Sequence, residues 1–535
     1  MSVVGIPDGF DKEAVDYLGK NGIIVIPQED CKKMGIEQLL TEADAVAARS
    51  ATKVADLPDN NKVKIFGRVG SGVDNFKKAE KKINELYIPI VNSPEPNSHS
   101  VPELLFSYLL NHVRPVENLF EKSRVLEWDK KKGNRLYGKT IGIVGAGLIG
   151  ANSSKIAEAL GMRILVYDIK PEFSKARGSF VNLDTLLQNS DYVALHVPAG
   201  EKPLIAEREL NLMKKDAVLI NLARGGVADE LFVLNALNSK KIARAYFDVF
   251  TTEPFENGSP VLRELLRHPN FYATSHIGAS TAEGEKEGAL IIAQKFVNYL
   301  NYGFLSDACN MKINKDLAGL RGLFHRFGMF TKQYFNGNIS EVKLSLDGEL
   351  LTSGDELRTQ LETSYLCGLL SDGSYVNPLN VNIAKGHLET KLTNVDEKKD
   401  DRVLLHVKAN GQEYFFELNY KTGRLTGISN NSNSKDMYKT DLGLAGHIGL
   451  FEHDDKTGAL SVITTKLALN DIGIQNLDTH PHNGSAITAT QTYSEIPQKV
   501  LEEYIKTSPH QLAPGKPEIN VRDAKYLRLP PADAF

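Results

Sequence analysis

Three polar side chains that could take part in one reaction each follow an apolar, strand-like run. Arg224 stands in Asn221-Leu-Ala-Arg-Gly-Gly226, Glu253 in Asp248-Val-Phe-Thr-Thr-Glu-Pro254, and His276 in His276-Ile-Gly-Ala-Ser-Thr281. In an open parallel sheet, ligands bind outside the carboxyl ends of the strands, so residues just past different strands can line one crevice. We therefore expect the three side chains to share a site.

Together these residue types can remove a hydride from a 2-hydroxy acid. An arginine can hold the substrate carboxylate through two charge-assisted hydrogen bonds. A histidine can accept the hydroxyl proton, and a glutamate on its other ring nitrogen fixes the tautomer. Taken singly, Arg224 could be a surface cation, Glu253 a carboxylate that starts a helix and His276 a structural histidine. Their occurrence at three consecutive strand ends favours catalysis.

A glycine loop upstream predicts a dinucleotide cofactor. Gly145-Ala-Gly-Leu-Ile-Gly150 follows an apolar run and opens a helical pattern, and Asp168 ends the next strand-like run. In this context the first glycine permits the turn, the second lets the backbone approach a pyrophosphate and the third lets helix and strand pack closely. An acidic residue at position 168 would bind ribose hydroxyls and repel a 2′-phosphate, so NAD is expected rather than NADP. The alternative is a packing turn followed by a surface aspartate.

Composition narrows the class of partner. The 535 residues are 41% hydrophobic and 24% charged, enough for several domains with cores of their own. With 63 basic and 67 acidic residues, the net charge of −4 indicates neither a nucleic acid nor a membrane partner, so we expect a small molecule. Cys31, Cys309 and Cys367 have no metal-site spacing, and we expect no metal, three buried thiols and a reducing compartment. The N-terminal sequence carries no leader-like pattern, so we expect a cytoplasmic protein.

Hydrophobic patterning predicts two α/β units in the first part of the chain. Strand-like runs at 2–6, 23–26, 45–48, 63–67 and 88–91 alternate with helical patterns, which indicates a parallel sheet. A polar break at 94–100 precedes a helical pattern at 101–113. A second series, at 141–144, 164–167, 192–196, 217–222, 243–248 and 271–275, indicates a doubly wound cofactor domain. The helical pattern 281–301 is expected to cross back to the first unit, leaving a cleft between the two.

After residue 305 the hydrophobic pattern of the chain changes. Longer runs of alternating polarity at 341–346, 403–408 and 413–418 predict sheets with one solvated face, with a solvated loop at 396–402 and a linker at 429–434. Beyond them the order is strand 446–453, helix 458–469, strands 474–480 and 486–493, helix 498–506 and strand 524–529. This βαββαβ order predicts a ferredoxin-like domain, with an exposed insertion at 508–516.

Several of these motifs resemble those of one enzyme family. They are Gly67-Arg-Val-Gly-Ser-Gly-Val-Asp-Asn75, Asn97-Ser-His-Ser-Val-Pro-Glu-Leu104, the glycine loop, Ala223-Arg-Gly-Gly226 and His276-Ile-Gly-Ala-Ser-Thr281. They look like the motifs of the D-isomer-specific 2-hydroxyacid dehydrogenases. The whole chain is similar to the long-form phosphoglycerate dehydrogenases of that family, more faintly around 346–350 and 368–381.

The resemblance implies a fold and a set of domains. The fold is α/β, with a Rossmann-type doubly wound parallel sheet, a flavodoxin-like substrate domain and α+β regulatory domains at the C-terminus. The implied domains are a substrate-binding domain of residues 1–95 and 282–305, an NAD-binding domain of 96–281, an intervening allosteric substrate-binding-like domain of 306–440 and an ACT-like domain of 441–535. A homo-oligomer, dimer or tetramer, is also implied, as is an amino-acid effector site in the ACT-like domain. That domain departs from the family pattern at Asp455-Lys-Thr-Gly458, so serine feedback is a hypothesis.

The resemblance also assigns residues. It implies Arg224, Glu253 and His276 as catalytic, and an NAD site lined by Ser71, Gly145, Gly147, Leu148, Ile149, Gly150, Asp168, Ala223, Asp248, Gly278 and Ala279. The substrate would meet Ser71, Gly72, Asn97 and Arg224, with its phosphate on Arg49 and Arg68. Lys132 and Arg135 are weaker candidates that could come from a partner subunit or a mobile loop, or be ordinary surface cations. His196-Val-Pro198 departs from the family pattern and removes one expected cofactor contact.

The expected reaction is the NAD-dependent oxidation of 3-phospho-D-glycerate to 3-phosphohydroxypyruvate, toward L-serine. One alternative is the same chemistry on another 2-hydroxy acid, such as the reduction of 2-oxoglutarate. Another is a cofactor-sensing regulatory protein, related to the family's transcriptional corepressors. The complete Arg–Glu–His set and the effector-like tail weigh against the regulatory protein.

Overall fold

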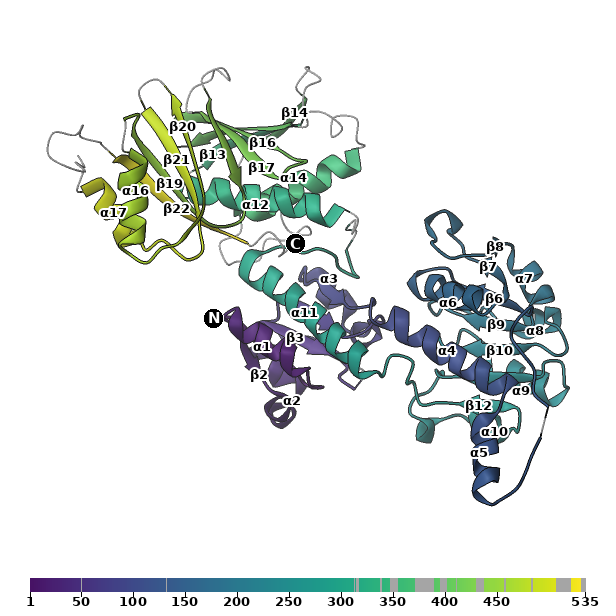
Figure 1. Cartoon of the computed structure of the whole chain (residues 1–535). Coiled ribbons are helices and arrows are strands. Elements are labelled where there is room, and N and C mark those ends of the chain that lie inside the picture. Colours follow the sequence, from purple (N-terminus) through teal and green to yellow (C-terminus); the bar gives the residue numbers. More distant parts are fainter. Residues whose placement is uncertain are drawn as a thin grey trace.

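A parallel sheet of five short strands begins the chain in the computed structural model (Figure 1). Its order is β2-β1-β3-β4-β5, which is the flavodoxin-like order expected. The strands are β1 (Val3–Gly5), β2 (Ile24–Ile26), β3 (Ala45–Ala48), β4 (Ile65–Arg68) and β5 (Ile90–Asn92), and the helices are α1 (Lys12–Lys20), α2 (Gln28–Glu42) and α3 (Glu80–Glu85). The structure describes residues 1–49, 51–130, 132–311, 313, 317–336, 339–346, 355–370, 389–394, 402–409, 411–429, 437–456, 459–482, 485–506 and 521–530.

The second sheet has seven parallel strands in the order β12-β11-β10-β9-β6-β7-β8. This is the Rossmann-type order, and it confirms the predicted doubly wound fold. Helices cover both faces, which is why β6, β9 and β10 are buried at every residue. The strands are β6 (Thr140–Val144), β7 (Arg163–Tyr167), β8 (Ser179–Phe180), β9 (Tyr192–Leu195), β10 (Val218–Asn221), β11 (Arg244–Phe247) and β12 (Phe271–Ala273), and the helices are α4 (Asn97–Val113), α5 (Val116–Arg124), α6 (Leu148–Ala159), α7 (Leu183–Asn189), α8 (Glu207–Leu212), α9 (Glu230–Asn238) and α10 (Pro260–Arg267).

The connection between the two units differs from the prediction in one respect. Residues 97–100, assigned to the polar break, form the first turn of α4. Serine hydroxyls stabilise that turn, since Ser98 donates to the Glu95 carbonyl at 2.6 Å and Ser100 to the Pro96 carbonyl at 3.5 Å. The prediction that 97–100 lie outside the helix is therefore wrong.

Helix α11 (Ala282–Tyr302) runs from the second sheet back onto the first (Figure 1). The helix packs on β4 at Gly67, where an added Cβ atom would lie 2.6 Å from Ile292 and from Phe296. Its last residue contacts the C-terminal half, because His325 Nε2 lies 2.6 Å from the Tyr302 carbonyl oxygen, and Arg321 donates to the Leu305 and Ser306 carbonyls just beyond the helix at 2.9 and 3.0 Å. One helix thus contacts the five-stranded sheet and the C-terminal half.

The C-terminal half contains two further sheets. The six-stranded sheet has the order β14-β13-β15-β16-β17-β18 and is antiparallel except for the β13–β14 pair. Buried residues alternate along β15, as its polarity pattern predicts. The strands are β13 (Ile339–Leu346), β14 (Glu389–Asn394), β15 (Arg402–Ala409), β16 (Gln412–Asn419), β17 (Arg424–Ser429) and β18 (Tyr438–Gly443), and they pack with α12 (Ala318–Tyr334) and α14 (Asp355–Leu370), two helices that the sequence analysis missed.

The last sheet confirms the βαββαβ prediction. Its order is β20-β21-β19-β22, all antiparallel, as in ferredoxin-like domains. Its elements are β19 (Gly446–Asp454), α16 (Ala459–Ala468), β20 (Ile474–His482), β21 (Ser485–Thr492), α17 (Gln498–Lys506) and β22 (Val521–Leu529). Most of the predicted loop at 396–402, most of the linker at 429–434, the insertion at 508–516 and the family-like segments 347–350 and 371–381 lie outside the described residues.

The three cysteines differ in their exposure. Cys31 and Cys367 are buried as expected, but Cys309 is exposed in the segment after α11, so that prediction was wrong for one thiol.

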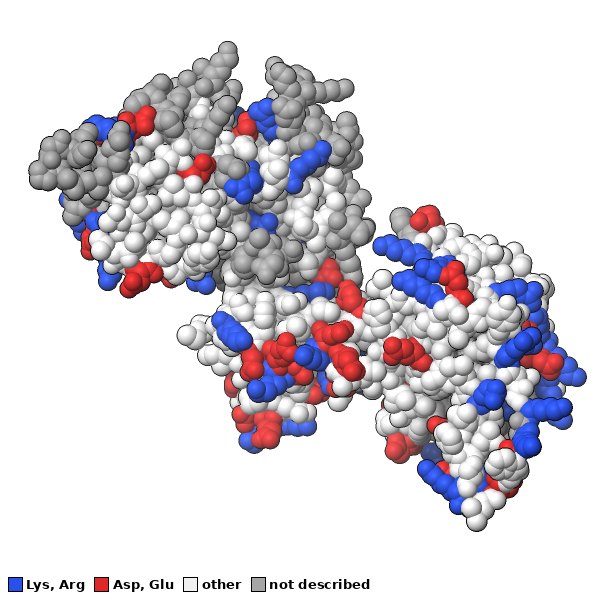
Figure 2. Space-filling view, viewed as in Figure 1, with Lys and Arg blue, Asp and Glu red and all other residues white. Residues whose placement is uncertain are grey.

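In the part of the chain that the structure describes, no helix combines the length and the apolar character needed to cross a membrane. Charges of both signs are spread over the visible face of the two α/β units (Figure 2).

The contact at Gly67 predicts a stability difference. Gly67→Ala forces a methyl group into Ile292 and Phe296, and overpacking of this kind costs about 1–3 kcal/mol. The thermal midpoint of the variant, followed by circular dichroism, should fall. Gly19→Ala is the matched control, because its Cβ meets no described atom within 4 Å inside α1, and its midpoint should stay equal or rise. Equal midpoints for Gly67→Ala and the wild type would contradict the packing of α11 on β4.

Candidate active site

His276 and Glu253 are in direct contact. The Nδ1 atom of His276 lies 2.8 Å from Oε2 of Glu253, and both side chains are partly exposed. Because an ionised carboxylate only accepts hydrogen bonds, Nδ1 donates and the Nε2 lone pair is left to accept a proton. His276 sits in the left-handed backbone region at φ = 58°, unusual for a residue with a side chain. The loop after β12 must therefore be held by other contacts.

Asp248 supplies those contacts from the end of β11. The residue is 1% exposed, and its carboxylate accepts from the backbone amides of Ile277 and Gly278 at 2.8 and 2.7 Å. Thr274 donates a further short hydrogen bond to Oδ1 and also contacts the Tyr108 hydroxyl of α4. The loop that carries His276 is thus fixed to the neighbouring strand end and to the connecting helix. Asp248 was predicted to line the cofactor site, and the structure adds this anchoring role.

The charge of Glu253 is stabilised by its surroundings. Burial alone would raise the pKa of its carboxyl group, but hydrogen bonds from His276 and the Phe250 amide, with the charges of His276 and Arg224, lower that pKa below its ordinary value. Glu253 is therefore an anion at neutral pH. The charge of Arg224, the third predicted residue, contributes to this lowered pKa.

Arg224 is held by a tight turn after β10. The buried Asn221 side chain accepts from the Ala223 amide and donates to the Arg224 carbonyl, both at 3.1 Å. An added Cβ atom on Gly225 would lie 2.0 Å from the Phe250 carbonyl oxygen, so only glycine lets the two strand-end loops approach this closely. Arg224 Nη1 donates to the Ala223 carbonyl at 2.7 Å, and the side chain extends toward the first unit.

Arg224 crosses from the second unit to the first. Its Nε lies 3.8 Å from an Asp74 carboxylate oxygen, and its Nη2 would lie 2.5 Å from a Cβ on Gly72. Ser71 and Asn97 lie beside this contact, with Asn97 Nδ2 donating to Ser71 Oγ at 3.3 Å. The predicted substrate residues of both units therefore meet at one place.

Two further arginines complete a cationic cluster. Asn75 accepts from Arg68 and donates to the Arg49 carbonyl, and burial, followed by the charges of Arg224 and Arg49, lowers the pKa of the Arg68 guanidinium to about 10. Arg68 Nε donates to Asn75 at 2.9 Å, and Arg49 pairs with Glu285 of α11. Such a cluster suits a substrate with two anionic groups.

The glycine loop has the geometry expected for a pyrophosphate. Gly145 has φ = 99° and an added Cβ would lie 2.4 Å from the His196 carbonyl oxygen, while a Cβ on Gly150 would lie 2.0 Å from the Gly145 oxygen. By contrast, a Cβ on Gly147 meets no described atom within 4 Å, and Gly147 is the N-cap of α6. The backbone is thus open to a phosphate at the helix N-terminus.

The other predicted cofactor residues lie beside this loop or farther along the same edge of the second sheet. Asp168 accepts from the Ala146 and Lys170 amides at 2.7 and 2.8 Å, which places its carboxylate beside the glycine loop. Leu148 is 56% exposed at the start of α6. Along the carboxyl edge of the second sheet lie Ile149, Ala223, Gly278 and Ala279. The weaker candidates Lys132 and Arg135 are exposed, and no described contact joins either to the site within the chain; Arg135 lies over the Tyr137 ring at 5.8 Å.

Sequence reasoning missed five side chains that the structure adds to the site. Asp74 and Asn75 follow Ser71-Gly72 and could have been found, since polar residues after β4 face the same edge. Thr274, Tyr108 and Glu285 act through contacts between distant segments and leave no local signal.

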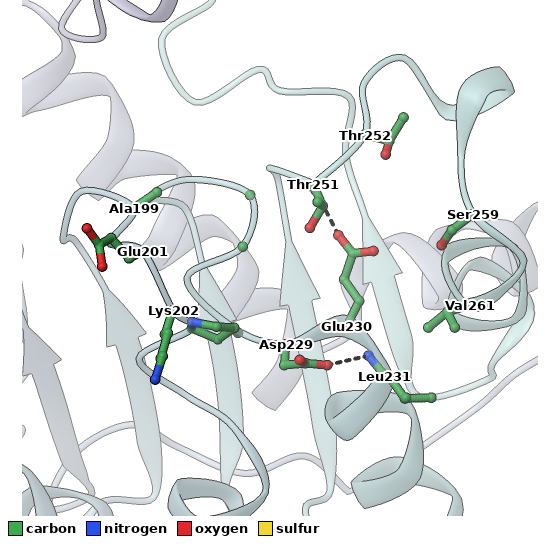
Figure 3. Close-up of a pocket in the computed structure, with 15 residues that line it drawn as sticks. Ala199, Glu201, Lys202, Asp229, Glu230, Leu231, Thr251, Thr252, Ser259 and Val261 are labelled. Atoms are coloured by element: carbon green, nitrogen blue, oxygen red, sulfur yellow. Dashed lines mark hydrogen bonds between the residues drawn. The ribbon is translucent and has the colours of Figure 1, made fainter.

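A cavity of about 420 Å³ lies beside the Arg224 loop, lined by Gly225 and Gly226 and by the loops after β9 and β11 (Figure 3). Two of its acidic groups serve local structure, because Asp229 accepts from the Leu231 amide at 3.0 Å and Glu230 from the Thr251 amide at 2.8 Å. Apart from the turn glycines, it shares no residue with the Arg–Glu–His site. We therefore place the chemistry at that site and not in this cavity.

The open position at Gly147 predicts a selective loss of cofactor binding. Gly147→Val fills the space at the N-terminus of α6 without a clash with described atoms at Cβ, so the fold should persist. The dissociation constant for NAD, measured by calorimetry, should rise by at least about tenfold, which is about 1.4 kcal/mol. Gly19→Ala should bind NAD like the wild type. Unchanged NAD affinity in Gly147→Val would show that the phosphates lie elsewhere.

Comparisons with known proteins agree with this geometry. Residues 106–278 match the family model of the D-isomer specific 2-hydroxyacid dehydrogenase, NAD binding domain. The chain is 28% identical to a D-3-phosphoglycerate dehydrogenase of Methanocaldococcus jannaschii, over 99% of this chain and 100% of that one. It is 30% identical to a D-3-phosphoglycerate dehydrogenase of Archaeoglobus fulgidus, over 88% of this chain and 91% of that one.

A solved structure shows the same fold. It is an NADPH-dependent glyoxylate/hydroxypyruvate reductase of Sinorhizobium meliloti, 20% identical, with a TM-score of 0.50 over 59% of this chain and 100% of that one. With the Rossmann-type sheet, the open glycine loop and the family match, NAD is the cofactor. The chain belongs to the D-isomer specific 2-hydroxyacid dehydrogenases and is an NAD-dependent oxidoreductase.

Proposed function

We propose that the enzyme oxidises 3-phospho-D-glycerate to 3-phosphohydroxypyruvate, reducing NAD to NADH and releasing a proton, toward L-serine. The observation that carries the proposal is the cluster of Arg49, Arg68 and Arg224 near the His276–Glu253 pair, in which Asn75 bridges the first two arginines and Arg224 lies against Gly72. A substrate with a carboxylate at one end and a phosphate at the other matches three converging cations. The two relatives that match nearly the whole chain are D-3-phosphoglycerate dehydrogenases, which supports the same substrate here.

In the proposed mechanism, each side chain has one task. Arg224 binds the carboxylate and stabilises charge on the adjacent oxygen. His276 accepts the hydroxyl proton at Nε2, while Glu253 holds Nδ1 and favours the imidazolium that forms. Bound NAD supplies the acceptor for the hydride. Arg68 and Arg49 bind the phosphate, which positions the hydroxyl-bearing carbon near His276.

The residues present fit the cofactor. The open N-terminus of α6 at Gly147 would hold the pyrophosphate, and Asp168 would hold the ribose hydroxyls. A carboxylate at this position repels a 2′-phosphate, so we propose a preference for NAD over NADP.

We also propose a homo-oligomer formed through the region around α5. Every residue of α5 is at least partly exposed, and large apolar side chains gather there, with Phe120 61%, Leu126 94% and Trp128 87% exposed. Exposed apolar patches of this kind mark protein interfaces. Lys132 and Arg135 adjoin this patch and would approach a partner's site. Sedimentation velocity should show a dimer or tetramer, and a monomer at micromolar concentration would refute this.

The C-terminal half is proposed to regulate the enzyme. We propose that the four sheets correspond to the four domains expected from the sequence, and that the last one takes an amino-acid effector in a cytoplasmic enzyme. The ferredoxin-like order β20-β21-β19-β22 supports an ACT-like domain. Calorimetry with L-serine tests the effector, and absence of heat at millimolar serine would remove serine from consideration.

Arg49→Ala tests the phosphate assignment. Loss of a charge-assisted contact to phosphate should lower kcat/KM for 3-phospho-D-glycerate by about 10- to 100-fold, while activity on D-glycerate changes little. The measurement is NADH formation across a panel that includes both acids and, in reverse, 2-oxoglutarate. Arg267→Ala, which removes an exposed arginine of α10, is the control. Equal losses on both acids would argue against phosphate recognition, and wild-type preference for another acid would replace the proposed substrate.

A further inference from the structure

The carboxylate of Glu285 contacts two guanidinium nitrogens of Arg49. Arg49 Nη1 donates to Oε2 of Glu285 at 3.2 Å, and Nη2 lies 2.5 Å from Oε1. The two residues are 236 positions apart in the sequence, one just past β3 and the other in the first turn of α11. The same two guanidinium nitrogens that would bind a phosphate therefore bind a carboxylate of the chain itself.

Arg49 does not need Glu285 to stay at the site. Its backbone amide donates to Asp8 at 2.6 Å, and its carbonyl accepts from the Asn75 side chain. Asn75 also accepts from the Arg68 side chain, so the first unit holds the backbone of Arg49 and the side chain of Arg68. Glu285 is thus not needed to bring the Arg49 backbone to the site, and it places a negative charge on the Arg49 guanidinium.

Glu285 is itself held close to the cluster. Thr281 caps α11 by accepting from the Gly284 amide at 3.0 Å, and the N-terminus of a helix favours a negative side chain in its first turn. The helix starts directly after the loop that carries His276. Since the side chains of Arg49 and Glu285 are 35% and 43% exposed, water can reach the pair, and an anion could displace the carboxylate.

We propose that Glu285 is a specificity-determining residue, a carboxylate of the chain that competes with the substrate phosphate for Arg49. The proposal rests on the proposed function. A substrate phosphate must displace Glu285 to reach both Nη atoms, whereas a substrate without a phosphate leaves the pair intact. Glu285 therefore raises KM for phosphorylated substrates and leaves kcat unchanged, because it makes no contact with the reacting atoms.

Glu285→Gln tests the competition. Exposed ion pairs are weak, so removal of the charge should lower KM for 3-phospho-D-glycerate by about two- to fivefold, with kcat and the kinetics on D-glycerate unchanged. Calorimetric binding of inorganic phosphate should tighten by a similar factor, which is a readout independent of activity. Glu283→Gln is the matched control, since Glu283 is an exposed carboxylate of the same helical turn. In an Arg49→Ala background, Glu285→Gln should change nothing further.

Two outcomes would overturn the proposal. A higher KM for the phosphorylated acid in Glu285→Gln would show that Glu285 positions Arg49, and an unchanged KM and phosphate affinity would show that the pair does not compete with the ligand. A wild-type enzyme that is inactive on 3-phospho-D-glycerate would instead refute the proposed function, and the phosphate titration would still decide whether Glu285 competes for Arg49.

Discussion

The site depends on one buried carboxylate. Asp248 is nearly inaccessible to water, and a buried charge is tolerated only when hydrogen bonds replace its hydration. The amides of Ile277 and Gly278 and the hydroxyl of Thr274 supply those bonds. In doing so they hold the loop after β12 in a conformation that places His276 against Glu253. The two amides belong to the loop that carries His276. The same hydrogen bonds therefore join the end of β11 to this loop and fix the position of the histidine.

The site is also divided between two sheets. Arg224, Glu253 and His276 come from the carboxyl edge of the seven-stranded sheet, whereas Arg49, Arg68 and Gly72 come from the five-stranded sheet. The chain passes between these units at α4 and α11, and both helices carry site contacts, through Asn97 and Tyr108 on α4 and Glu285 on α11. Any relative movement of the two units must therefore change the distance between the carboxylate-binding arginine and the other two cations.

Much of this arrangement could be predicted, because it follows from local rules. Apolar strand-like runs that end in polar residues place those residues at one edge of a parallel sheet, and glycines at fixed spacing describe a turn that no other residue can form. Arg224, Glu253, His276 and the glycine loop were found in this way. The contacts of Tyr108 with Thr274 and of Arg49 with Glu285 were not, since they join segments more than 160 residues apart.

Helices α12 and α14 were not predicted for a different reason. A Cβ on Gly328 of α12 would lie 2.0 Å from the Tyr365 carbonyl, and one on Gly368 of α14 equally close to the His325 carbonyl. Glycine lowers intrinsic helix propensity, and here it is required because the two helices touch backbone to backbone. The contact between the two helices thus requires glycine, although glycine in the sequence alone indicates that a helix is unfavourable.

The central proposal is that His276 takes the substrate proton while Glu253 holds its ring. The most direct measurement is kcat of His276→Gln at saturating substrate and NAD, with binding of both ligands checked by calorimetry. The account predicts that both ligands bind nearly as in the wild type and that kcat falls by about 10²- to 10⁴-fold, the range that general base catalysis contributes. A kcat within threefold of the wild type, with both ligands bound, would contradict it.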